Sequence, residues 1–247
     1  MEAGVALVTT DARHTPSGLT LPFHRHHRQA GIAVRQLEAS TPFRKRLWQT
    51  LVRAKIENQA AHLRLLDRPN AGALLAMAAL VSSGDAANVE ARAARDYWKS
   101  LFENFIRDDP SDLRNKALNY GYAVVRACLA RALVGVGRLP SIGLHHASVS
   151  NAFNLADDLF EPFRPLVDRA VAELTAGRDM RSDLTKEDRR LLAALPLADL
   201  SLSGEIMTLV AATEKCAESL ARAFEAGDSK ALRLPAFAPS TVAADAA

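Results

Sequence analysis

Cysteine is scarce in this chain. Only Cys128 and Cys216 occur in 247 residues, and each falls inside a helical pattern. Two cysteines cannot make a disulfide framework or a cysteine-rich zinc site, so we expect both to be small buried apolar residues. Such cysteine usage is typical of a protein of the reducing cytoplasm.

Long hydrophobic runs are absent as well. The longest apolar stretch is Ala71 to Val81, which contains one glycine and is too short to span a bilayer. The start of the chain, MEAGVALVTTDAR, does not read as a signal peptide. The sequence also lacks a phosphate loop, a dinucleotide fingerprint, a serine nucleophile elbow and a paired CxxC motif. These absences exclude nucleotide-binding and serine-nucleophile classes built on those motifs.

The charge balance is mildly basic. The formal net charge is +3 with a pI near 9.0, and 49% of the residues are hydrophobic, so a globular chain that binds nucleic acid is permitted but not required. A helix expected from Thr41 onward has no acid before Glu57. Its expected solvent side carries six cations: Arg44, Lys45, Arg46, Arg53, Lys55 and Arg64. This face is either simply solvated or a phosphate track.

Hydrophobic periodicity predicts a mainly α fold. Two short strands joined by a hairpin-like loop are expected at Val5 to Thr10 and Leu19 to Phe23. Helices are then expected at 41 onward, at 69–81 in a central buried position, and at 88–106, 111–135 and 203–226. Gly121, in the middle of a long helix, is expected to permit the close packing of another helix.

The stretch from Gly143 to Asp168 has two unlike faces when drawn as a loop followed by a helix. One face is small, amide-bearing and acidic, and comprises Ala147, Ser150, Asn151, Asn154, Asp157, Asp158 and Glu161. Such a face is suited to a positive partner. His145 and His146 precede its first turn, so an imidazole and the Glu161 carboxylate can converge with a second carboxylate from elsewhere. Two oxygen donors and one nitrogen donor suit Mg²⁺ or, better, Mn²⁺.

Glu90 is the candidate for that second carboxylate. On the expected helix after Asn88 it shares the inward face with Ala94 and Tyr97. It is either an acid that complements the helix dipole or a functional group. An inward glutamate is costly unless a cation or a hydrogen bond compensates it.

Three separated motifs carry a family resemblance. They are GLHHASVSNAFNLADDLFEPFRPLVD from Gly143, VEARAARDYW from Val89 and LNYGYAVVRA from Leu118. Together they resemble the CRISPR adaptation integrase, in the form that accompanies type II systems, and the match runs from about Glu2 to about Pro235. The resemblance implies a metal-dependent DNA endonuclease and integrase that inserts short foreign fragments into a CRISPR array. It also implies homodimers bridged by a small adaptation protein.

The resemblance divides the chain into three parts. Residues 1–23 correspond to the last strands and linker of the family's N-terminal β-domain, most of which is expected to be missing. Residues 24–235 correspond to an all-helical catalytic domain, and residues 236–247 are expected to be a disordered tail.

The same resemblance assigns the site. Glu90, His146 and Glu161 match the family's catalytic metal ligands, for Mn²⁺ or Mg²⁺. His145 is then a neighbour, and Asp158 a supporting group or an extra charge near the ion. Asn119, Asn154 and Arg164 are left as supporting groups or DNA contacts. Arg164 is as well suited to pairing with Asp158 or Asp168 as to contacting phosphate.

Three hypotheses remain open. The first is the integrase, which requires metal and all three ligands. The second is a metal-dependent nuclease of branched DNA without integration, which shares the site and differs in giving no joined product. The third is an inactive helical DNA-binding scaffold, whose DNA binding is indifferent to Glu161.

Overall fold

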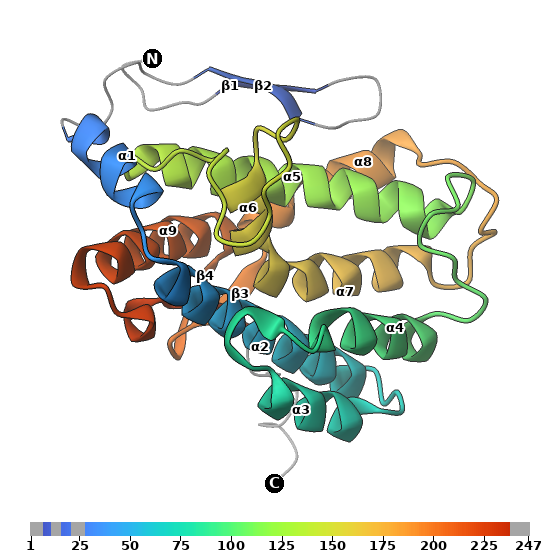
Figure 1. Ribbon diagram of the computed structural model, residues 1–247. Coiled ribbons are helices and arrows are strands. Elements are labelled where there is room, and N and C mark those ends of the chain that lie inside the picture. Colours follow the sequence, from blue (N-terminus) through green and yellow to red (C-terminus); the bar gives the residue numbers. More distant parts are fainter. Residues whose placement is uncertain (1–6, 11–15, 21–27, 238–247) are drawn as a thin grey trace, which may run out of the picture.

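The protein is a body of packed helices with a strand pair at one end (Figure 1). The computed structural model describes residues 7–10, 16–20 and 28–237. The α-helices are α1 (Gln29–Leu37), α2 (Thr41–Leu65), α3 (Ala71–Leu80), α4 (Val89–Leu101), α5 (Leu113–Gly135), α6 (Asn154–Phe160), α7 (Arg164–Thr175), α8 (Lys186–Ala193) and α9 (Leu209–Ala226). The mainly α prediction is confirmed.

Short elements connect these helices. The 3-10 turns are η1 (Ser83–Asp85), η2 (Glu161–Phe163), η3 (Leu195–Leu197) and η4 (Ser229–Ala231). The strands are β1 (Leu7–Thr10), β2 (Pro16–Thr20), β3 (Asp199–Leu202), β4 (Glu205–Thr208) and β5 (Pro235–Ala236). The predicted N-terminal strand pair is confirmed as antiparallel, with Leu7 opposite Thr20, but its second strand is Pro16–Thr20 rather than Leu19 to Phe23. Residues 5, 6 and 21–23 of the prediction lie outside the described residues.

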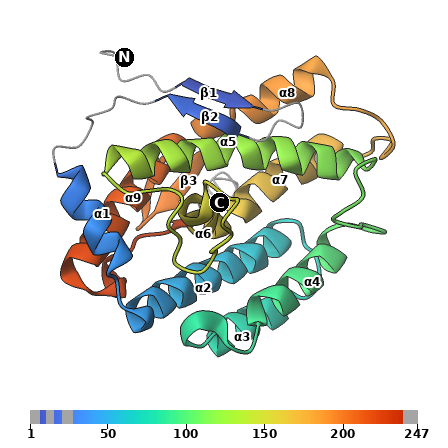
Figure 2. The same ribbon diagram turned by 45° about the horizontal axis from the view of Figure 1, so that its top comes forward.

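Helix α2 is the central support of the site. It begins where the sequence indicates, because the Ser40 hydroxyl accepts a hydrogen bond from the Phe43 amide and Pro42 occupies its first turn. Leu47, Leu51 and Ile56 in its buried stripe have no exposed surface. Helix α5 lies across the opposite side of the body, with α6 between the two long helices (Figure 2).

Gly121 permits the close approach of α5 to α7, as predicted. A Cβ atom at this position would lie 2.6 Å from Val167 Cγ1 on α7 and 3.2 Å from Leu195 Cδ1 on η3. Both distances are below ordinary van der Waals contact. The glycine therefore sets how near α7, which carries part of the site, can lie to α5.

The all-helical prediction for the catalytic part is wrong in one region. The expected helix over 203–226 begins only at Leu209, because residues 199–208 form the hairpin β3–β4, joined by Ser203 (φ 55°) and Gly204 (φ 87°). Two consecutive positive φ values are the geometry of a tight type I′ turn. Strand β5 pairs with the other edge of β3, in the order β4-β3-β5, and includes Ala236, where the disordered tail was expected to start.

Three other helix predictions need correction. The helix expected over 88–106 ends at Leu101. The helix expected to begin near Ala147 begins at Asn154, and Ala147 to Phe153 is irregular. The apolar helix α3 is not central, since it packs on the outside of α2 and leaves Leu80 65% exposed (Figure 1). The high hydrophobicity of α3 therefore did not predict whether the helix lies in the centre of the protein or on its outside.

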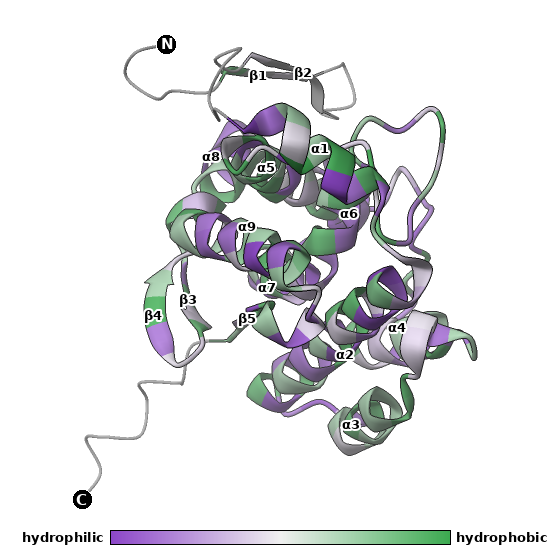
Figure 3. Cartoon of the chain, turned by 60° about the vertical axis from the view of Figure 1, so that its left-hand side comes forward, coloured by the Kyte–Doolittle hydropathy of each residue, from purple (hydrophilic) through white to green (hydrophobic). Residues whose placement is uncertain are grey.

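No helix within the described ranges is long and apolar enough to cross a membrane. Hydrophilic and hydrophobic residues instead mix around α2, α5 and α9 (Figure 3).

We predict that Gly121→Ala destabilises the fold. Overpacking against Val167 costs about 1–3 kcal/mol, whereas the better helix propensity of alanine returns only about 1 kcal/mol. Thermal unfolding should therefore show a lower melting temperature. Gly72→Ala on α3 is the matched control, because nothing lies within 4 Å of a Cβ there. Equal melting temperatures for the two variants would contradict the packing argument.

Candidate active site

A polar pocket of about 220 Å³ lies where α2, α4, α5 and α7 meet. Its acids and cations come from distant parts of the chain. The lining residues are Lys55, Gln59, Glu90, Ala94, Trp98, Arg107, Tyr122, Glu161, Arg164 and Asp168. Two of the three predicted ligands, Glu90 and Glu161, thus share one pocket.

Lys55 joins these two carboxylates. Its ammonium pairs with Glu90 Oε1 and lies 2.5 Å from Glu161 Oε2. The Lys55 and Glu161 side chains are only 7% and 6% exposed, and Glu90 is 26% exposed. The prediction that Lys55 lies on the solvent side of α2 is therefore wrong. An inward Glu90 was expected to need a cation or a hydrogen bond, and Lys55 supplies the cation.

The burial of Lys55 follows from how α2 is covered. Helix α2 packs against α3 and α4 on one side and against η2 and α7 on another, so little of its middle faces water. Burial alone would lower the pKa of Lys55, but Glu161 and Glu90 outweigh it and raise the pKa. Lys55 is consequently held as an ammonium.

Glu161 is a buried carboxylate between two cations. Arg164 Nε donates a hydrogen bond to Glu161 Oε1 at 3.0 Å, while Lys55 occupies Oε2. Burial raises the pKa of Glu161, but Arg164 and Lys55 outweigh burial and lower the pKa to about 2. The Arg164 guanidinium also lies over the rings of Tyr122 and Phe160, at 4.8 and 4.7 Å. Its partner is therefore Glu161 rather than Asp158 or Asp168.

The start of α4 fixes Glu90. Asp85 accepts hydrogen bonds from the amides of Val89 and Glu90, both at 2.9 Å. Asn88 directly precedes the helix, but its side chain makes no capping bond and its φ is 49°. Asp85 satisfies the free amides in its place, which holds Glu90 in the first turn of α4.

Asp158 anchors the loop that carries His146. Its fully buried carboxylate accepts hydrogen bonds from the amides of Leu144, His145 and His146. It also lies 2.7 Å from His146 Nδ1, and this hydrogen bond is the main reason that the pKa of His146 is raised. With Nδ1 committed to Asp158, Nε2 is the ring nitrogen left to bind another group.

The position of Gly143, just before this loop, has no room for a side chain. A Cβ atom there would lie 2.2 Å from the His146 carbonyl oxygen and 2.8 Å from Asp158 Oδ2. Any side chain at this position would push the loop away from its anchoring carboxylate.

The other candidate residues have structural partners. The His145 ring stacks on Trp48 with a centroid distance of 4.2 Å, and Asn119 accepts a hydrogen bond from Arg107. Asn154 donates to the carbonyls of Ser141, Ser148 and Asn151 and accepts from the Ser148 amide. Asn154 therefore shapes the His146 loop from inside.

A buried polar chain that sequence reasoning missed runs behind the pocket. Tyr97 and Tyr122 both donate hydrogen bonds to Asp168, and His62 Nδ1 lies 2.7 Å from the Tyr97 hydroxyl. Because Tyr97 donates its proton to Asp168, its oxygen accepts one from His62, which fixes the His62 tautomer. Burial raises the pKa of Asp168 to about 6 and lowers that of His62 to about 3.

The three predicted ligands are not fully assembled. In the parts of the chain that the structure describes, no group of three or more His, Cys, Asp or Glu side chains is close enough to hold a metal ion. Glu90 and Glu161 meet through Lys55, and His146 is near enough for its charge and that of Glu161 to affect each other's pKa. The catalytic and metal-binding roles of these residues stay predictions.

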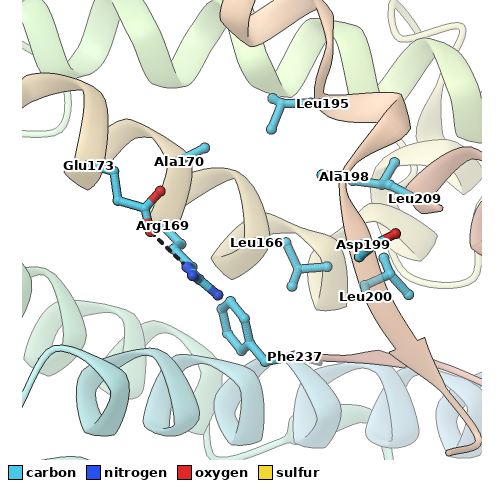
Figure 4. A pocket seen from close by; sticks show the side chains of 10 residues that line it. All are labelled: Leu166, Arg169, Ala170, Glu173, Leu195, Ala198, Asp199, Leu200, Leu209 and Phe237. Atoms are coloured by element: carbon cyan, nitrogen blue, oxygen red, sulfur yellow. Dashed lines mark hydrogen bonds and ion pairs between the residues drawn. The ribbon is translucent and has the colours of Figure 1, made fainter. Parts of the chain in front are cut away.

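A second pocket, of about 240 Å³, lies on the other side of α7. Its lining is mainly apolar and includes Leu166, Leu195, Leu200 and Phe237, with the ion pair of Arg169 and Glu173 at its edge (Figure 4). This lining offers no convergent acids comparable to those of the first pocket.

Comparisons with known proteins agree with one another. The family model described as CRISPR associated protein Cas1 matches residues 1–194. The CRISPR-associated endonuclease Cas1 of Neisseria meningitidis is 40% identical over 243 residues, covering 96% of this chain and 79% of that protein. The CRISPR-associated endonuclease Cas1 2 of Pyrobaculum aerophilum is 32% identical over 156 residues, covering 61% and 52% of the respective chains.

Two solved structures share the fold. A casposase bound to integration product has a TM-score of 0.75 at 21% identity, covering 92% of this chain and 73% of that one. A Cas6-RT-Cas1–Cas2 complex has a TM-score of 0.72 at 20% identity, covering 95% and 30%. At these identities the likeness concerns the fold alone.

We predict that Asp158→Asn loosens the His146 loop. The amide side chain offers one acceptor oxygen where the carboxylate satisfies three amides and an imidazole, so hydrogen exchange at residues 144–146 should accelerate. Asp157→Asn is the matched control, because Asp157 binds Arg126 and Asn151. Unchanged protection of 144–146 in Asp158→Asn would contradict the anchoring role.

We also predict that His62 weakens the fold in acid. A lowered pKa gives stability that is complete above the ordinary value of 6.5 and is lost as pH falls toward about 3. The loss approaches about 1.4 kcal/mol per pH unit. Asp168, with its raised pKa, acts in the opposite direction between 3.8 and about 6.

His62→Gln isolates the histidine contribution to this balance. The free energy of unfolding of the native protein minus that of His62→Gln should decrease as pH falls below 6.5, as measured by urea denaturation. A difference that does not depend on pH would show that His62 contributes nothing to acid sensitivity.

Proposed function

The chain belongs to the Cas1 family of CRISPR-associated proteins, and from that membership we propose that it is a metal-dependent DNA endonuclease and integrase. Its proposed reaction is the insertion of short foreign DNA fragments, as spacers, into a CRISPR array. The type II association proposed here rests on the motif resemblance, including the glutamate at position 161.

One observation carries the metal-dependent chemistry. Glu90 and Glu161, from α4 and η2, share a single cation inside a polar pocket. Two carboxylates gathered around one positive charge are a donor set that suits Mg²⁺ or Mn²⁺. His146, with Nε2 directed by its bond to Asp158, would supply the nitrogen donor.

Glu90, His146 and Glu161 would hold the ion. When bound, Mn²⁺ or Mg²⁺ supplies Lewis acidity that stabilises the phosphate oxygen and lowers the pKa of the attacking hydroxyl. Arg107 and Arg164 line the same pocket, and their guanidinium groups would neutralise and orient the scissile phosphate. Water as the attacker gives cleavage, whereas the 3′-hydroxyl of a captured fragment gives strand transfer.

The proposed partners follow from charge and family. Helix α2 still offers a basic track for a DNA backbone although Lys55 is buried. Its exposed cations are Lys45, Arg46, Arg53 and Arg64, and Arg44 is half-buried. Duplex fragments and the CRISPR repeat would be the substrates. We further propose a homodimer bridged by a small adaptation protein, acting in the cytoplasm, where the array is accessible.

A nuclease of branched DNA is the second candidate. It uses the same acids and the same ion, so no residue of the pocket separates it from the integrase. Only covalent joining of a fragment into target DNA distinguishes the two. A DNA-binding scaffold is the third, because Lys55 fills the space between the two carboxylates.

We predict that Glu161→Gln and Glu90→Gln each reduce joining by about a hundredfold or more, since each removes a charged metal ligand. The assay measures joining of a labelled duplex with free 3′-hydroxyls into plasmid DNA, with Mn²⁺ or chelator and with the bridging partner present. Pre-branched DNA is run in parallel to follow transesterification without the partner.

Glu173→Gln is the matched control, because Glu173 forms an exposed pair with Arg169 outside the pocket of Glu90 and Glu161. Cleavage without joined product would support the nuclease. DNA binding without either product, in native protein and in Glu161→Gln alike, would support the scaffold.

A further inference from the structure

We propose that Lys55 is a positioning residue whose ammonium holds Glu90 and Glu161 together until a divalent cation takes its place. This inference rests on the proposed metal-dependent function. In the metal-free protein the Lys55 ammonium takes the place of the ion, so the two carboxylates are already close together before the metal binds.

The contacts of Lys55 place it between the two acids. Lys55 reaches from α2 to Glu90 on α4 and Glu161 on η2, two residues that are 71 positions apart in the sequence. Arg164 occupies the other oxygen of Glu161, so Lys55 is the cation that spans both carboxylates. An ion bound by Glu90 and Glu161 together would need the space of the ammonium.

The charges require such a substitute. Without compensation, the buried Glu161 and the half-buried Glu90 would repel each other and lose hydration, which is destabilising. The ammonium removes that cost in the metal-free protein. A lysine suits exchange better than an arginine does, because its charge is compact and its stem is flexible.

The pocket also contains a hydrogen-bond acceptor for the displaced Lys55 ammonium. Gln59 lies one turn further along α2, is 2% exposed, and lines the same pocket. Its Oε1 atom has no hydrogen-bond partner among the described residues. Asp168 also lines the pocket, and it is near enough to Lys55 for the ammonium charge to lower its pKa. Gln59 Oε1 is therefore an acceptor for Lys55 once an ion holds the two glutamates.

The test is a titration of Mn²⁺ alone, without DNA, followed by the electron paramagnetic resonance signal of free Mn²⁺. Native protein is compared with Lys55→Met, Gln59→Leu, Arg53→Met and Glu161→Gln. Lys55→Met should bind Mn²⁺ about tenfold more tightly, because the ion no longer competes with a fixed positive charge. Gln59→Leu should bind it more weakly, because the displaced ammonium loses its acceptor.

Arg53→Met is the matched control. It removes a cation from the same helix, at an exposed position where Arg53 bonds to the Val81 carbonyl, and should leave Mn²⁺ affinity unchanged. Melting temperatures give a second readout. Lys55→Met should melt lower than native protein in chelator and gain more than native protein does from added Mn²⁺.

The outcomes separate this inference from the proposed function. Mn²⁺ binding to native protein that Glu161→Gln abolishes, with equal or weaker binding in Lys55→Met, would overturn the role of Lys55 and keep the metal centre. Absence of Mn²⁺ binding in native protein and in Lys55→Met would overturn the metal centre itself. If Lys55→Met does not fold, Gln59→Leu decides: weaker binding supports the exchange, and unchanged binding refutes it.

Discussion

The site depends on one buried ion-pair triad, in which the Lys55 ammonium lies between the carboxylates of Glu90 and Glu161. Three elements that are far apart in the sequence meet there, and none of the three charges would be tolerated in the interior alone. The triad therefore fixes the relative positions of α2, α4 and η2. It also brings the two carboxylates together in one polar pocket.

The polar groups behind the triad are nearly all paired. Asp168 accepts from Tyr97 and Tyr122, and Asp158 accepts the amides of the His146 loop. Networks satisfied in this way are rigid, because moving one member leaves another unpaired in a medium of low dielectric. The site is thus built on a stiff helical frame, and the flexible stem of Lys55 is the component best able to move within it.

Local signals in the sequence predicted much of this frame. The predictions of a helix from Thr41, of close packing at Gly121 and of an inward Glu90 all rest on short-range rules of packing and periodicity. The β3–β4 hairpin was missed, although its Ser-Gly turn between alternating residues is a recognisable signal. The predicted start of α6 was too early. The small polar residues before Asn154 are compatible with a helix and with a loop, so their pattern did not distinguish the two.

The sequence by itself determined the mainly α fold and the family, and it predicted that Glu90 and Glu161 come together. These results depend on periodicity and on motifs that are local in the chain. Only the tertiary structure decided that Lys55 is buried, that Asp158 holds the His146 loop and that His62 joins a tyrosine–aspartate chain. A helical wheel shows which residues share a face, but not which face other helices cover. Burial of a charge is a property of that covering, so it emerges only when the elements pack.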